Sequence, residues 1–131
     1  MVDDDKPILI DSLLILEEVV PNAAVTGVSR PQEAIDYAKA NRVDLAFLDI
    51  ELGKSSGLDL CRFLIEINLC SKLVYLTAYP DYALDAWETG ACGFMVKPLR
   101  ISIRDLAKIQ NFFLFFENYP GFCHVYERFA W

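Results

Sequence analysis

The sequence predicts an α/β fold in which helices cover both faces of a parallel β-sheet. Residues 44–50 and 72–77 are nearly unbroken apolar runs, which is typical of strands buried on both faces of such a sheet. These runs alternate with segments of about ten residues whose apolar positions recur at helical spacing. This alternation favours crossover connections within one sheet. The length of 131 residues fits one domain with a sizeable core.

The first elements are defined by their end signals. Residues 7–20 are predicted to form a helix, and a proline ends it. A short strand is expected at 23–29. Ser29, followed by a proline and then by Gln32, is a helix-start signature, so the next helix is expected at 31–41.

The remaining elements continue the alternation. They are strand 44–50, loop 51–57, helix 57–68, strand 72–77, helix 82–90 and strand 92–96. A last helix is expected to end near Phe116, before a Pro–Gly turn signal. We therefore assign residues 1–117 to one domain and 118–131 to a tail, which could begin an output domain.

Charge and cysteine content exclude several classes of protein. The formal net charge of −7 argues against a nucleic-acid surface on this domain, because phosphate binding needs clustered Lys and Arg. No apolar run is long enough to span a membrane, and the acidic amino terminus does not resemble a signal peptide. The four cysteines lie far apart, which favours reduced thiols and a cytoplasmic location. They are Cys61, Cys70, Cys92 and Cys123.

Polar residues end the predicted strands. Asp49, Thr77 and Lys97 each follow an apolar run, and Asp3 and Asp4 follow the first one. Because ligands bind at the carboxyl ends of parallel strands, these side chains are expected to converge. Clustered carboxylates suit Mg²⁺, while a hydroxyl and an ammonium can bind a phosphoryl group. Aspartate is also a nucleophile toward phosphate.

Four stretches together resemble the receiver domains of two-component response regulators over residues 2–99. They are "VDDD", "LAFLDIELGKSSGLDL", "YLTAYPDYALDAWETGACGF" and "VKP". The resemblance implies a flavodoxin-like, five-stranded sheet of order 2-1-3-4-5 and a phosphorylation-dependent switch served by a sensor histidine kinase. The aromatic stretch "AYPDYALDAW" is most similar to receivers of LytTR-type regulators, which act in transcription.

The resemblance also implies a role for each site residue. Asp49 would be the phosphoacceptor, with Thr77 and Lys97 binding phosphoryl oxygens. Metal ligands would be Asp4 directly, Asp3 through water, Asp49, and the backbone carbonyl of Glu51. Phe94 would be the aromatic switch, and the Lys97–Pro98 peptide bond would be cis. The domain would not be an enzyme, apart from slow self-dephosphorylation, and a homodimer is compatible with the resemblance.

Three features depart from the receiver pattern. Only Met1 and Val2 precede Asp3, so the first strand is expected to be truncated. Residues 7–11 could take its place, with Asp11 entering the pocket. Gly53 stands where receivers usually have proline, and Gly93 where an acid is frequent.

Three other functions stay open at this point. A receiver-like interaction module that has lost phosphorylation would account for the short first strand. A phosphatase of the haloacid-dehalogenase type also uses an aspartate nucleophile with Mg²⁺, although "LDIEL" lacks its DxD pattern. A flavodoxin-like cofactor binder is disfavoured because the loops lack a phosphate-cradling cluster of Gly, Ser and Thr.

Overall fold

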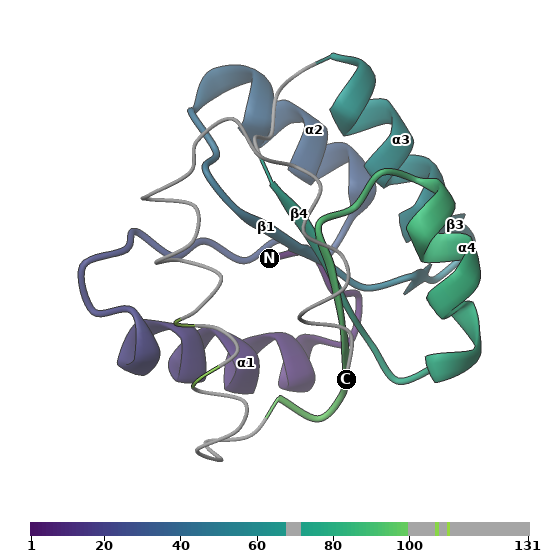
Figure 1. Ribbon diagram of the computed structural model, residues 1–131. Coiled ribbons are helices and arrows are strands. Elements are labelled where there is room, and N and C mark those ends of the chain that lie inside the picture. Colours follow the sequence, from purple (N-terminus) through teal and green to yellow (C-terminus); the bar gives the residue numbers. More distant parts are fainter. Residues whose placement is uncertain (68–71, 100–106, 108–109, 111–131) are drawn as a thin grey trace.

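The computed structural model describes residues 1–67, 72–99, 107 and 110, and within them it forms three layers (Figure 1). Helix α1 (Lys6–Val19) covers one face of a parallel sheet. Helices α2 (Pro31–Ala40), α3 (Gly57–Glu66) and α4 (Ala83–Glu88) pack on the other face. The last helix expected near Phe116 and the tail 118–131 lie outside the described residues.

Three parallel strands form the centre of the sheet. Their order is β1 (Ala46–Leu48), β4 (Leu73–Thr77) and β5 (Gly93–Val96). Val2 continues the sheet beyond β1, because it forms parallel bridges both to Leu48 and to Val28. The order across the sheet is therefore Val28, Val2, β1, β4, β5, which matches the predicted order 2-1-3-4-5.

The first predicted strand is indeed short, and the backbone at Val2 forms hydrogen bonds with the segments on both sides of it. Its N–H donates to Phe47 O at 2.8 Å, and its carbonyl accepts from Asp49 N at 2.9 Å. On the other side, Asp3 N donates to Val28 O at 3.2 Å. One residue therefore fills the line of the sheet between Val28 and β1, and Asp3 follows it directly.

The alternative first strand at residues 7–11 is wrong, because these residues belong to α1. Asp5 caps this helix by accepting from Ile8 N at 3.2 Å. A proline at the start of a helix loses no hydrogen bond, because the first N–H groups have no partner within the helix. The chain therefore turns into α1 at once after the acidic residues.

The strand expected at 23–29 is reduced to the single bridge at Val28. The following helix begins as expected at Pro31, but its N-cap is Arg30, whose side chain does not cap it. Glu33 instead accepts from the backbone N–H of Ser29 at 3.2 Å. The helix-start signature is thus correct in position, whereas its acceptor is Glu33 and not Gln32.

The predicted loop 51–57 is a small hairpin. Strands β2 (Glu51–Leu52) and β3 (Ser55–Ser56) pair in antiparallel fashion. Gly53 in the turn has a φ of 62°, a left-handed conformation that glycine adopts without steric cost. Ser56 then caps α3, since its Oγ accepts from Leu58 N at 3.1 Å.

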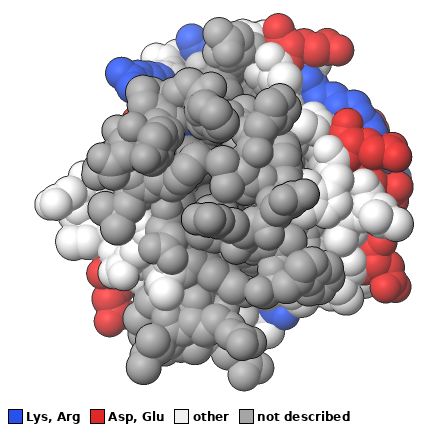
Figure 2. All heavy atoms as spheres, viewed as in Figure 1, with Lys and Arg blue, Asp and Glu red and all other residues white. Residues whose placement is uncertain are grey.

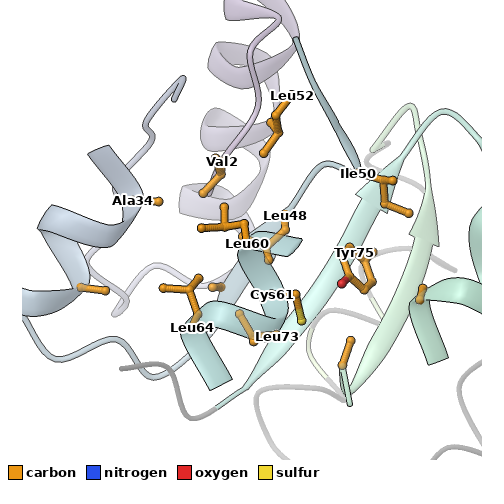
Figure 3. Close-up of a cluster of buried hydrophobic side chains, with 14 residues drawn as sticks. Val2, Ala34, Leu48, Ile50, Leu52, Leu60, Cys61, Leu64, Leu73 and Tyr75 are labelled. Carbon is orange, nitrogen blue, oxygen red and sulfur yellow. The ribbon is translucent and has the colours of Figure 1, made fainter. Parts of the chain in front are cut away.

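The remaining predicted elements are present with shifted bounds. The predicted helix 82–90 begins as a 3-10 turn, η1 (Pro80–Tyr82), and continues as α4. Figure 3 shows the larger core cluster, to which Tyr75 of β4 and Leu60 and Cys61 of α3 belong. The hydroxyl of this buried tyrosine donates to Thr89 Oγ1 at 3.0 Å. Within the described part of the chain, no helix combines the length and apolar character needed to cross a bilayer.

Candidate functional site

Three carboxylates meet at the carboxyl end of the sheet. Asp3, Asp4 and Asp49 each present one oxygen, and these oxygens all lie within 4.8 Å of one another. Asp3 is completely buried, Asp49 is 6% exposed, and Asp4 is exposed. Val2 and β1 are adjacent, so their strand ends bring the three acids together. The prediction that these acids converge is confirmed.

Lys97 supplies the positive charge of this cluster. Its Nζ lies 2.5 Å from Asp3 Oδ2 and 2.6 Å from Asp49 Oδ2, and its side chain is only 7% exposed. The backbone N–H of Lys97 donates to Thr77 O at 2.8 Å, which fixes the end of β5 beside β4. The Lys97–Pro98 peptide bond is cis, as the resemblance implies.

Burial and ion pairing act against each other in the pKa values of this cluster. Burial raises the pKa of Asp3 above its ordinary value, although the contact with Lys97 partly opposes this. Burial would lower the pKa of Lys97, but its contacts with Asp3 and Asp49 outweigh burial and raise that pKa. The ammonium is therefore held in its charged form by the two acids.

The backbone around Asp49 orients its carboxylate. Ile50 N donates to Asp49 Oδ1 at 2.7 Å, while Oδ2 faces Lys97. Helix α3 begins directly against this backbone, and Gly57 N donates to Ile50 O at 2.7 Å. A Cβ atom on Gly57 would lie 1.9 Å from the carbonyl oxygen of Asp49, so only glycine fits there. The start of α3 therefore fixes the position of Asp49.

Thr77 ends β4, which pairs with β1, and Phe94 lies on β5, which pairs with β4. Thr77 is completely buried, and its Oγ1 accepts from Tyr79 N at 3.4 Å. Its side chain is held by the β4–η1 loop in this structure, not by the carboxylates. Phe94 pairs with Tyr75 in the sheet and is partly buried against the larger core cluster.

Glu51 bridges two loops at the edge of the site, which the sequence analysis did not anticipate. Its Oε1 accepts from the hydroxyl of Tyr82 at 3.4 Å. Tyr79 lies edge-on to Tyr82 with ring centroids 6.2 Å apart, and hydrogen bonding to Glu51 raises the pKa of Tyr79. The aromatic stretch after Thr77 was the available signal, but a contact across 31 residues is not readable from local spacing.

The donor set fits a hard divalent cation. All three converging ligands are carboxylates, and one of them is exposed, which leaves a route from solvent. Asp3 Oδ2 is buried and has no hydrogen-bond partner among the described residues beyond its ion pair with Lys97. Mg²⁺ is commonly held by one or two carboxylates together with waters and phosphate oxygens. The residues therefore suit Mg²⁺ and a phosphoryl group in the same pocket.

Comparison with known proteins agrees with this geometry. Residues 1–109 match the family model described as the response regulator receiver domain. An uncharacterized response regulatory protein of Vibrio cholerae is 34% identical over 101 residues, which cover 76% of this chain and 39% of that protein. The sensory transduction protein LytT of Enterococcus faecalis is 33% identical over 99 residues, 75% of this chain and 41% of its own length. The chain thus spans about two-fifths of the length of these relatives.

Solved structures share the fold. A CheY-like receiver domain protein of Methanospirillum hungatei has a TM-score of 0.74 at 24% identity, covering 92% of this chain and 94% of its own. The response regulator TrrA of Thermotoga maritima, solved in complex with Mg²⁺ and BeF, has a TM-score of 0.72 at 25% identity, covering 84% and 93%. Because the family model matches residues 1–109, this chain belongs to the response regulator receiver domains, the phosphorylation-controlled signalling domains of two-component systems.

Proposed function

We propose that this receiver accepts a phosphoryl group on Asp49 from a sensor histidine kinase, with Mg²⁺ held by Asp3, Asp4 and Asp49. The observation that carries this proposal is the placement of Lys97 between Asp3 and Asp49 at the carboxyl end of the sheet. A buried ammonium beside an acceptor carboxylate can bind a phosphoryl oxygen once the carboxylate has reacted. The backbone carbonyl of Glu51 is proposed as a further metal ligand.

In the proposed reaction, a carboxylate oxygen of Asp49 attacks the phosphorus of the donor. A P–O bond to Asp49 forms, and the P–N bond to the kinase histidine breaks, so the histidine nitrogen leaves with the electron pair. Bound Mg²⁺ would neutralise charge on the phosphoryl oxygens. Lys97 exchanges part of its contact with Asp49 for a phosphoryl oxygen and keeps its contact with Asp3.

The switch follows from the added charge. A phosphoryl group brings about −1.5 to −2 charges at neutral pH and new hydrogen-bond acceptors. Thr77 Oγ1 accepts a long bond from Tyr79 N at 3.4 Å, and in the proposed switch its hydroxyl turns to donate to a phosphoryl oxygen. Its movement would draw in the β4–η1 loop and free space for Phe94 to change rotamer. The responding surface is proposed to be η1, α4 and β5.

The remaining roles are proposals at the level of the whole protein. The domain is expected to lose its phosphoryl group slowly and to work in the cytoplasm, with homodimerisation as one output. Figure 2 shows acidic side chains along the edge of the view beside α3 and α4. This charge supports the proposal that any DNA contact of the whole protein is made by a domain other than this one.

Binding of beryllofluoride tests the proposal. The full chain is titrated with Mg²⁺ and then with beryllofluoride, and backbone amide spectra are recorded. We expect saturable shifts at Thr77, Phe94 and Lys97, and a mass increase of one phosphoryl group with a small phosphodonor. Asp49→Asn should abolish both, whereas Asp44→Asn, on an exposed residue paired with Arg42, should change neither.

This experiment and two simple assays separate the rival functions. A folded chain that binds neither Mg²⁺ nor beryllofluoride would support an interaction module that has lost phosphorylation. Sustained hydrolysis of a phosphate ester would support a phosphatase, and a coloured purified protein would support a flavin binder. The family match and the carboxylate–ammonium cluster favour the phosphoacceptor over all three.

A further inference from the structure

Helix α4 is held at its two ends in different ways. Its amino end follows η1, and the exposed segment 78–81 leads into it from β4. Its C-cap residue is Thr89, whose exposed fraction is only 8%. Within the helix, Ala86 is buried whereas Leu84 is 78% exposed. The contacts at the two ends therefore have a large part in holding the helix in place.

The carboxyl end of α4 is joined to the core by side-chain hydrogen bonds around Thr89. Its Oγ1 accepts from the hydroxyl of Tyr75 at 3.0 Å and donates to the carbonyl of Ala86 at 2.6 Å. The thiol of Cys61 donates to the same oxygen at 3.5 Å. Tyr75 and Cys61 are both completely buried in the larger core cluster (Figure 3). This end is therefore tied to β4 and α3 at once, and separating it would leave buried polar groups unpaired, which is costly.

The amino end of α4 is joined to the edge of the acidic site by an exposed contact. The hydroxyl of Tyr82 donates to Glu51 Oε1 at 3.4 Å, which is long for a bond between two oxygens. Glu51 is exposed, begins β2 and lies two residues after Asp49. Water can replace an exposed bond of this length at little cost. This contact is therefore the weaker of the two attachments, and it is the one next to the site.

We infer that α4 pivots about Thr89, and that the contact between Tyr82 and Glu51 holds its amino end in place at rest. When this contact opens, η1 and the first turn of α4 can move, while the bonds of Thr89 keep the last turn on β4 and α3. Movement should therefore be largest at η1 and decrease toward Thr89. Both attachments belong to the resting molecule. That the chemistry of Asp49 opens the contact rests on the proposed function, so the test is made without cation or phosphodonor.

The first variant of the full chain opens the amino end. Glu51→Ala removes the acceptor of the Tyr82 hydroxyl, and Asp44→Ala, which loses the same charge at an exposed site, is its control. Backbone amide relaxation, measured by NMR, gives the order parameter of each residue. We expect it to fall from about 0.85 toward about 0.6 at Tyr82 and Ala83 in Glu51→Ala and to stay unchanged at Thr89. Asp44→Ala should leave both ends unchanged.

The second variant weakens the carboxyl end. Tyr75→Phe removes the hydroxyl that donates to Thr89, and Tyr37→Phe, whose hydroxyl belongs to an exposed pair, is its control. We expect amide hydrogen exchange to become about tenfold faster at Thr89 and at Cys92, whose N–H donates to a β4 carbonyl at 2.7 Å. Exchange in α2 measures unfolding of the whole domain, so the rates at Thr89 and Cys92 are compared with it. The order parameters of η1 should not change in this variant.

Three results would overturn the inference. The first is an unchanged order parameter at Tyr82 in Glu51→Ala, since the contact would then hold nothing in place. The second is an equal fall at both ends of α4 in that variant, since the helix would then move as a whole. The third is exchange at Thr89 in Tyr75→Phe that rises only as much as exchange in α2, since this end would then have no local anchor. The beryllofluoride titration decides separately whether Asp49 is the acceptor.

Discussion

Lys97 and Asp49 lie 48 residues apart in the sequence, yet they form a buried ion pair in which Nζ is 2.6 Å from Oδ2. Lys97 also contacts a second carboxylate, that of Asp3, which is completely buried. The ammonium is therefore shared between Asp3, which follows Val2, and Asp49, which follows β1. The stability of the resting pocket and its response to cations both depend on this sharing.

Replacing Lys97 by methionine should destabilise the fold. The change leaves two carboxylates without their buried counter-charge, which typically costs about 3 kcal/mol or more. Urea unfolding measures the loss, and Lys54→Met on an exposed residue of the β2–β3 turn is the control. Mg²⁺ should restore more stability to Lys97→Met than to the wild type, because it replaces the missing charge. Equal effects of Mg²⁺ on both proteins would contradict this account.

Replacing Asp4 by asparagine should weaken Mg²⁺ binding without unfolding the protein. Asp4 is exposed, so loss of its charge costs little stability, but it is one of the three converging carboxylates. We expect the Mg²⁺ affinity to fall about tenfold or more, since even indirect partners of a metal have effects of this size. Isothermal titration calorimetry measures the affinity. Asp44→Asn carries the same charge change away from the pocket and should leave the affinity unchanged.

Replacing Gly57 by alanine should destabilise the protein by about 2 kcal/mol or more, because overpacking against immobile backbone is costly. The added Cβ would lie 1.9 Å from the carbonyl oxygen of Asp49 and 2.9 Å from the Cα of Ile50. Ser55→Ala, on an exposed residue of the neighbouring hairpin, is the control. A thermal midpoint within one degree of the wild type would show that α3 can shift away freely.

Stability should fall steeply in alkali. The pKa of Tyr75 is raised above its ordinary value of 10.0 by burial, and that of Lys97 is raised above 10.5 because its acidic partners outweigh its burial. For both groups the unfolded chain loses its proton at lower pH than the folded chain. Their contribution is therefore complete below about pH 10 and is lost as the pH rises through the folded pKa values.

Urea unfolding between about pH 9 and 11.5 (roughly one unit either side of these ordinary values) measures this loss. Tyr75→Phe removes the titrating hydroxyl and should flatten part of the slope, although it also leaves Thr89 without this donor. Tyr37→Phe is the control, because its hydroxyl contacts Thr26 in an exposed pair. Identical slopes in the wild type and Tyr75→Phe would rule out a contribution from Tyr75.

Much of the site was predictable because the ends of buried strands can be recognised in the sequence. A polar residue after an apolar run fixes the end of a buried strand, and parallel strands present their ends at one edge. Asp49 and Lys97 could be placed together on that ground alone. The short contact of Lys97 with Asp3 was not predictable, because it depends on Val2 pairing between Val28 and β1.

The hairpin and the edge of the sheet were not predictable, for a related reason. Strands β2 and β3 have two residues each, which is too short for any alternation of apolar and polar residues to show. Residues 23–29 do have a strand-like composition. A strand, however, needs a neighbour along its length, and Val2 provides one only at Val28. Pairing between distant segments, not local preference, decides both cases.

The close contact of Gly57 with the Asp49 carbonyl joins the acceptor backbone to the first turn of α3 as one rigid joint. Main-chain movement at Asp49 would have to carry α3 with it, and α3 is anchored in the core through Leu60, Cys61 and Leu64. The main chain that carries the Asp49 carboxylate is therefore held in a fixed position. A conformational change that starts at Asp49 must therefore be carried by movements of the surrounding side chains.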